Sequence, residues 1–140
     1  MSEHQRPIVT VDVVILTLEG EELKVLLTER DKGPFEGRLA LPGGYVHTDE
    51  DADTESAARR VLKQKVDAGG FHMEQLQTFS GPARDPRGYS ISVSYLALVP
   101  PSHLPKGALL MPVEEASGLA FDHDRIVQAG VDRLRRKAAY

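Results

Sequence analysis

The feature that most limits the fold is a run of β-branched and apolar residues near the N-terminus, at residues 8–17 (IVTVDVVILT). Apolar side chains occupy both odd and even positions of this run, whereas a strand with one solvated face alternates apolar and polar residues. We therefore expect a strand buried on both faces, with another layer of the protein packed on each side. A chain of 140 residues is long enough to build these layers around one core, so we expect a single domain over residues 1–140.

Other segments show the periodicity of strands. A second strand is expected at residues 23–30, and Gly20 lies in the turn that would join it to the first strand as a hairpin. The stretch Pro42-Gly43-Gly44 would interrupt the first of four further strands, which are expected at residues 39–46, 71–81, 89–99 and 109–111.

Two segments are expected to be helices. In residues 51–65, Asp53 can cap the first turn, and two apolar pairs spaced four residues apart would face the core: Ala57 with Val61, and Ala58 with Leu62. In residues 122–140, basic side chains gather near the C-terminal end, where they suit the helix dipole. The residues of this second helix that we expect to face the body of the protein are Ile126, Ala129 and 131–134.

Composition argues against several classes of protein. The chain has 17 Lys and Arg against 21 Asp and Glu, a net charge of −4, so no basic surface indicates nucleic acid. It has no cysteine, hence no disulfide framework and no thiolate metal site. No stretch approaches the roughly 18 apolar residues of a membrane span, and the first residues lack the apolar core of a signal peptide. We therefore expect a cytoplasmic protein with no membrane partner.

A motif stands in the middle of the chain, where residues 33–46 (GPFEGRLALPGGYV) precede an acid-rich loop. This region resembles the Nudix (MutT-like) superfamily, whose box reads G-x5-E-x7-R-E-U-x-E-E-x-G-U, with U an aliphatic residue. Gly44 and Glu50 match its first two anchors. Residues 84–99 and 119–126 are similar to the branch that contains ADP-ribose pyrophosphatases and Nudix-related transcriptional regulators. The resemblance implies the Nudix fold, of class α/β (α+β), in which a mixed β-sheet is sandwiched between helices.

The second half of the box departs from the family pattern. Nudix hydrolases hold Mg²⁺ with carboxylates spaced three and four residues apart on one helix face, because Mg²⁺ prefers oxygen ligands in octahedral geometry. Residues 56–66 contain no Asp or Glu in any register, so the resemblance implies a degenerate box. With Arg60 as the motif's arginine, the loop from Glu50 is two residues longer than in the family, and the remaining motif positions are filled by Val61, Gln64, Lys65 and Asp67. With Arg59 in that place, the glutamate positions hold Arg60, Lys63 and Gln64.

Carboxylates remain in the loop before this helix. Glu50 and Arg60 are the remnant catalytic positions of the box, expected to be inactive; Arg60 could pair with Glu50 to brace the loop, or both could be solvated charges. We expect no metal ligands and no cofactor. The alternative is an active hydrolase that uses Mg²⁺ at a relocated site built from Glu50, Asp49, Asp51 and Asp53.

Several residues outside the box are candidates for binding a nucleotide. Arg30, at a strand end, resembles a family position near the pyrophosphate, and Arg84 and Arg87 flank a polar turn; guanidinium groups suit bidentate contacts to phosphate, although each could be a plain surface charge. Phe35 could stack on a base or pack as a lid. His123 could titrate usefully or be a structural histidine near a helix start. The backbone of Gly43 and Gly44 completes the expected ligand site.

Two functions of different classes stay open, with a purely dimerising Nudix module as a third. The first is a non-hydrolytic sensor that binds ADP-ribose or a related nucleoside diphosphate derivative. The alternative is an active Mg²⁺-dependent hydrolase of the ADP-ribose pyrophosphatase type. In regulators of this kind the resemblance implies a winged-helix DNA-binding domain after the Nudix domain, which residues 1–140 lack, so we expect no nucleic acid to bind through this domain alone. The resemblance also implies a homodimer.

Overall fold

Strand β1 (Ile8–Glu19) forms the centre of the sheet, as its double-sided apolar pattern predicts. The computed structural model describes residues 6–66 and 71–138; Asp67 and the last two residues of the expected C-terminal helix lie outside this part. The first half of β1 pairs with β4 (Gly43–Tyr45) and its second half with β2 (Glu22–Glu29), both antiparallel.

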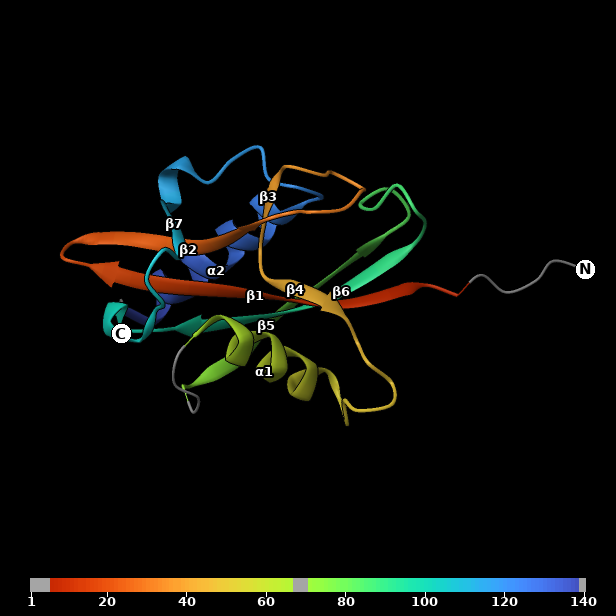
Figure 1. The fold of residues 1–140 in the computed structure, drawn as a ribbon, viewed down its shortest axis with the longest axis horizontal. Coiled ribbons are helices and arrows are strands. Elements are labelled where there is room, and N and C mark those ends of the chain that lie inside the picture. The colour runs from red at the N-terminus through yellow and green to blue at the C-terminus, as the bar shows by residue number, and fades with distance from the viewer. Residues whose placement is uncertain (1–5, 67–70, 139–140) are drawn as a thin grey trace, which may run out of the picture.

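A parallel partner lies on the other side of β1. Strand β6 (Ser90–Leu98) runs parallel to β1 over nine residue pairs, from Ile8 opposite Ser90 to Leu16 opposite Leu98. Within the described residues the mixed sheet has seven strands, with the main order β3-β2-β1-β6-β5 (Figure 1). Its remaining strands are β3 (Leu39–Ala40), β5 (Met73–Gly81) and β7 (Leu109–Pro112).

The two faces of the sheet are covered by different helices, α1 (Thr54–Lys65) and α2 (His123–Ala138). Val13 and its odd-numbered neighbours in β1 pack with α1, while Val14 and Leu16 pack with α2. All of these side chains are fully buried. The expected arrangement, a mixed sheet sandwiched between helices, is confirmed. Two short 3₁₀ helices, η1 (Pro101–His103) and η2 (Val113–Glu115), lie in the connections on either side of β7.

Helix α1 begins at Thr54, three residues later than expected. The side chain of Asp53 accepts a hydrogen bond from the backbone N–H of Ser56 at 2.8 Å, so Asp53 is the N-cap, and the residues before it belong to the loop. The face predicted from the apolar spacing is correct, because the buried residues of α1 are Ala57, Ala58, Val61 and Leu62.

The buried face of α2 differs in part from the expected one. Ile126 and Val131 are buried as predicted, but Asp132, inside the expected apolar segment, is exposed. The periodicity also missed three buried residues of this helix: His123, Val127 and Gly130. No helix in the described part of the chain is long and apolar enough to cross a membrane.

Candidate functional site

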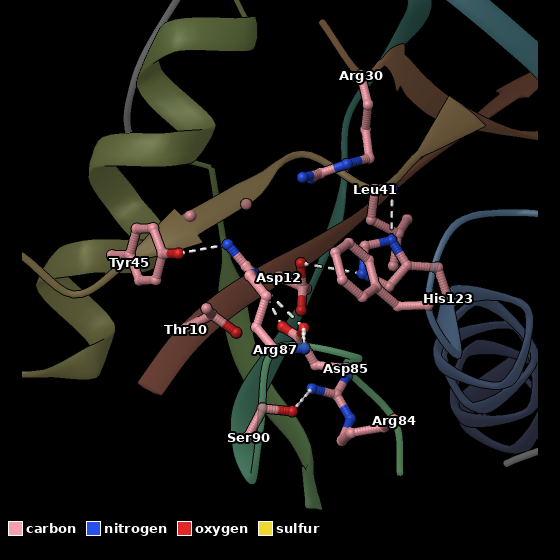
Figure 2. A pocket seen from close by; sticks show the side chains of 13 residues that line it. Thr10, Asp12, Arg30, Leu41, Tyr45, Arg84, Asp85, Arg87, Ser90 and His123 are labelled. Atoms are coloured by element: carbon pink, nitrogen blue, oxygen red, sulfur yellow. Dashed lines mark hydrogen bonds and ion pairs between the residues drawn. The ribbon is translucent and has the colours of Figure 1, made fainter. Parts of the chain in front are cut away.

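A small cavity opens beside the first half of β1, where β4, the start of β6 and the start of α2 come together (Figure 2). Its volume is about 110 Å³. Five of the six residues expected to bind a ligand line it: Arg30, Gly43, Gly44, Arg84 and Arg87. Sequence reasoning did not assign a site role to other residues that line it, including Asp12, Tyr45, Asp85 and Phe121.

Two of the arginines are held in place by carboxylates of the protein. Arg84 donates two hydrogen bonds to Asp122 and one, of 2.8 Å, to the hydroxyl of Ser90. Arg87 donates from Nε and Nη2 to the two oxygens of Asp85, at 3.1 and 2.9 Å. Burial raises the pKa of Asp85, but the hydrogen bonds from Arg87 outweigh it and leave that pKa below its ordinary value. Both guanidinium groups are therefore fixed in orientation before any ligand arrives.

Arg30 is held differently. Its Nε donates a hydrogen bond of 2.7 Å to the carbonyl oxygen of Pro34, and its guanidinium lies 4.8 Å from the centre of the Phe121 ring. Within the described residues it forms no ion pair with a carboxylate. Figure 2 shows its terminal nitrogens pointing into the cavity, so this guanidinium has uncommitted donors directed at the site.

Phe35 does not line the cavity. It lies in a neighbouring depression, which shares Arg84 and Phe121 with the cavity. The rings of Phe35 and Phe121 meet edge to face with their centres 4.9 Å apart. Both residues have positive φ angles, 63° and 55°, which are uncommon for bulky side chains. The aromatic contact helps to offset that strain.

The floor of the cavity is polar and buried. Asp12 is 6 % exposed and accepts a hydrogen bond of 2.6 Å from the hydroxyl of Ser92. Nδ1 of His123 accepts the backbone N–H of Leu41 at 2.9 Å, so the proton of the neutral imidazole is on Nε2, which lies 3.4 Å from Asp12. The sequence did contain a signal for Asp12, because it is the one charged residue in a strand segment predicted to be buried on both faces.

The two glycines of β4 differ in their surroundings. A Cβ atom added at Gly43 would lie less than 3.0 Å from Oδ1 of Asp12 and from the carbonyl oxygen of Val11. At Gly44 the same atom would meet nothing within 4 Å. Gly43 thus lets β4 close against β1 directly over the Asp12 carboxylate.

Glu50 and Arg60, the remnant catalytic positions of the box, do not line the cavity and lie in a separate depression. Arg60 donates two hydrogen bonds to Asp51, at 3.1 and 2.8 Å, and its Nε lies 3.3 Å from Glu50. Arg60 also donates to the backbone oxygen of Tyr45, whose hydroxyl accepts a hydrogen bond from Arg87. Of the two alternatives left open for Arg60, the structure has the pair with Glu50, but the two hydrogen bonds of Arg60 to a carboxylate go to Asp51. Tyr45 connects this loop brace to the cavity.

Three of the four loop acids offered as an alternative metal site already have other partners. Asp51 binds Arg60 and the backbone N–H of His47, Glu50 binds the His47 ring, and Asp53 caps α1. Asp49 is exposed. Over residues 6–66 and 71–138 no group of three or more His, Asp or Glu side chains is arranged to hold a metal ion.

The positions of the missing glutamates do not share one environment. Val61 is 3 % exposed and belongs to the apolar cluster between α1 and the sheet, with Val13 and Leu26. Gln64 is exposed and Lys65 is partly exposed. When Arg60 is taken as the motif's arginine, the position of the first glutamate is thus occupied by Val61, a residue that packs in the core.

Comparisons with a family model and with known proteins agree on one family. A model of the NUDIX domain matches residues 6–135. The ADPR responsive transcriptional repressor NtrR of Acinetobacter baylyi is 31 % identical over 147 residues, which cover 99 % of this chain and 59 % of the repressor. The ADP-ribose pyrophosphatase of Methanocaldococcus jannaschii is 34 % identical over 127 residues, covering 87 % of this chain and 72 % of the enzyme.

A similar solved structure is the NUDIX domain of Shewanella oneidensis NrtR in complex with ADP ribose. It superposes with a TM-score of 0.83 at 32 % identity, over 94 % of this chain and 90 % of that domain. The chain thus matches nearly the whole of an isolated NUDIX domain but about three-fifths of the length of the full repressor from Acinetobacter.

Proposed function

The chain belongs to the Nudix family, and from that premise we propose that it binds ADP-ribose, or a closely related nucleoside diphosphate derivative, as a sensor domain that does not hydrolyse it. The observation that carries the proposal is the pairing of a cavity lined by three arginines with a box helix that has no Asp or Glu from residue 56 to its end. The first feature suits a diphosphate, and the second removes the ligands of the catalytic metal.

The cavity supports binding by its charges and by their arrangement. Asp85 and Asp122 orient Arg87 and Arg84, whereas Arg30 has free donors for phosphate oxygens. A cavity of about 110 Å³ is smaller than the roughly 300 Å³ at which sites for whole small molecules begin. We therefore place one part of the ligand in the cavity and the rest across its mouth, toward the depression beside Phe35.

The surroundings of α1 argue against hydrolysis. Attack of water on a diphosphate needs a metal ion to neutralise the phosphate charge and to activate the water. The residues here do not fit Mg²⁺, because Val61 is packed in the core, Lys65 would repel the ion, and Gln64 is a neutral ligand at best. We infer no hydrolytic step for this chain.

Isothermal titration calorimetry with ADP-ribose tests the binding. We expect a defined affinity that does not change when EDTA is added, because no metal takes part. Arg30→Ala should weaken binding by about 1.5–3 kcal/mol, the value of a hydrogen bond to a charged group. Arg135→Ala, an exposed change near the C-terminal end of α2, is the matched control and should leave affinity unchanged. Absence of heat and of any thermal shift at millimolar ADP-ribose would end the proposal.

The competing function is hydrolysis, and the observation in its support is the similarity to an archaeal ADP-ribose pyrophosphatase. It predicts release of AMP and ribose 5-phosphate from ADP-ribose in the presence of Mg²⁺ or Mn²⁺. We expect turnover near the uncatalysed background. A rate above about 1 s⁻¹, within the ordinary range of enzymes, would decide for the hydrolase.

We also propose that the chain forms a homodimer. Leu18 and Leu98 are 52 % and 49 % exposed at the ends of β1 and β6, and they extend the face on which Leu16 packs against α2. Exposed leucines that continue a core face are suited to burial against another chain. Light scattering at micromolar concentration should give twice the mass of the chain, and the mass of a single chain would contradict the proposal.

A further inference from the structure

The cavity that we assign to a diphosphate has a carboxylate on its floor. Asp12 is 6 % exposed and is one of the residues that line the cavity. The residues at the mouth are far more open: the side chain of Arg87 is 37 % exposed, and Tyr45 is 50 % exposed. Figure 2 shows Asp12 between Arg87 and His123. Arg84 and Asp85 also line the cavity and are about as buried as Asp12, but they are engaged with Asp122 and with Arg87. Asp12 is the lining carboxylate that no arginine pairs with among the described residues.

The partners of Asp12 on the protein fix its orientation but do not fill its capacity to accept hydrogen bonds. The Ser92 hydroxyl donates to Oδ2, and Nε2–H of His123 faces Oδ1 from 3.4 Å. The proton is on Nε2 because Nδ1 accepts the N–H of Leu41. A carboxylate has about four acceptor sites, so about two have no partner among the described residues. Gly43 packs against Oδ1, so donors can reach the free acceptor sites only from the side of Asp12 that lines the cavity.

The chemistry of these free acceptor sites selects the part of a ligand that can reach them. A phosphate offers only acceptors at neutral pH and would be repelled by the carboxylate. Sugar hydroxyl groups are donors, and the hydrogen bond that a hydroxyl donates to a carboxylate is short and strong. Resting on the proposed function, we propose that Asp12 is a specificity-determining residue, which accepts hydrogen bonds from the hydroxyl groups of the sugar distal to the adenosine, while the arginines bind the diphosphate.

This assignment fixes the direction of the ligand. The distal sugar occupies the floor, since a cavity of about 110 Å³ cannot hold more than a fraction of the molecule. The diphosphate lies between Arg30 and the arginines of loop 84–87, and the adenosine extends outward. The favoured ligand class is then a nucleoside diphosphate esterified to a sugar with free hydroxyl groups.

The test compares ADP-ribose with the tetrahydrofurfuryl ester of ADP, which keeps the diester charge, the ring and the ring oxygen but lacks every hydroxyl of the distal sugar. Calorimetry on the wild-type chain should show ADP-ribose binding roughly 10- to 150-fold more tightly, the range for losing a hydrogen bond to a charged group. Asp12→Asn should bring this ratio down at least several-fold. A purely structural role would weaken both ligands equally and leave the ratio unchanged.

Asp132→Asn, an exposed change on α2, is the matched control and should keep the wild-type ratio. If the wild type binds neither compound, the proposed function fails and this inference fails with it. If the wild type binds both within about threefold, or if folded Asp12→Asn keeps the wild-type ratio, the role of Asp12 is refuted while the proposed function stands. Should Asp12→Asn fail to fold, Asp12→Ser, which also removes the carboxylate, replaces it, and an unchanged ratio in that folded variant would also refute the role.

Discussion

Among the individual residues, Asp51 connects the loop before α1 to the helix. Two hydrogen bonds from Arg60 lower the pKa of Asp51 from 3.8 to about 2. Because the pKa is depressed in the folded state, the ionised carboxylate stabilises the fold above the unfolded pKa, and this contribution is lost as the pH falls from about 4 through about 2. We expect Asp51→Asn to lower Tm at pH 7 and to have little effect at pH 2. Thermal unfolding of the wild type and of Asp51→Asn between pH 2 and pH 7 tests this dependence, with Asp49→Asn as the control from the same loop.

The two glycines of β4 give a second prediction for single residues. Gly43→Ala places a Cβ against Asp12 and the backbone of Val11, so we expect a loss of about 1–3 kcal/mol, as for other overpacked sites. Gly44→Ala meets open space and should be neutral or slightly stabilising. Urea unfolding of both variants measures the difference. Equal stabilities would show that β4 can move away from β1 at no cost.

At the scale of secondary-structure elements, α1 gives a prediction about the lost metal site. With Arg60 as the motif's arginine, restoring the family's glutamates would need Val61→Glu, which puts a carboxylate into the apolar cluster beneath the helix. We expect this change alone to cost about 3 kcal/mol or more, because the charge has no partner there. Lys63→Glu, at an exposed position of the same helix, should cost less than about 0.5 kcal/mol. Chemical denaturation measures the free energy of unfolding of both variants. A Val61→Glu protein as stable as Lys63→Glu would mean that the buried face of α1 opens to water.

The same two helices show how far periodicity predicts an element. For α1 the spacing of apolar residues identified all four buried positions, because this helix packs through aliphatic side chains alone. For α2 it missed Gly130, although a glycine costs about 1 kcal/mol within a helix and therefore suggests close packing. A Cβ there would lie 2.9 Å from the side chain of Val14. His123 is a structural histidine at the helix start, one of the two alternatives the sequence left open, but its partners at Leu41 and Asp12 could not be read from any local pattern.

For the whole molecule, the candidate site depends on pairings between distant parts of the chain. Asp12 and Ser92 are 80 residues apart in sequence and meet because β1 and β6 run parallel side by side. The sequence predicted both strands, and it predicted all the arginines and glycines that line the cavity, the glycines through the family resemblance. It could not predict that Asp12, Ser92 and His123 meet at the floor of the cavity, because strand order and register decide which polar residues become neighbours. Nor could it show that Arg84 and Arg87 are held by Asp122 and Asp85, which is a property of the folded loop.

A site assembled in this way predicts how a ligand affects the stability of the entire fold. The lining residues come from β1, β4, β6, the loops around them and the start of α2, so the site exists only when all of these have assembled. ADP-ribose should therefore bind the folded chain and not the unfolded one, and stabilise it by about 2.7 kcal/mol at one hundred times Kd. At roughly 2–4 °C per kcal/mol for a chain of about this size, Tm should rise by about 5–11 °C. EDTA should leave the rise unchanged, and Arg30→Ala should reduce it at the same ligand concentration. A rise that requires Mg²⁺ would instead indicate that the metal site was retained.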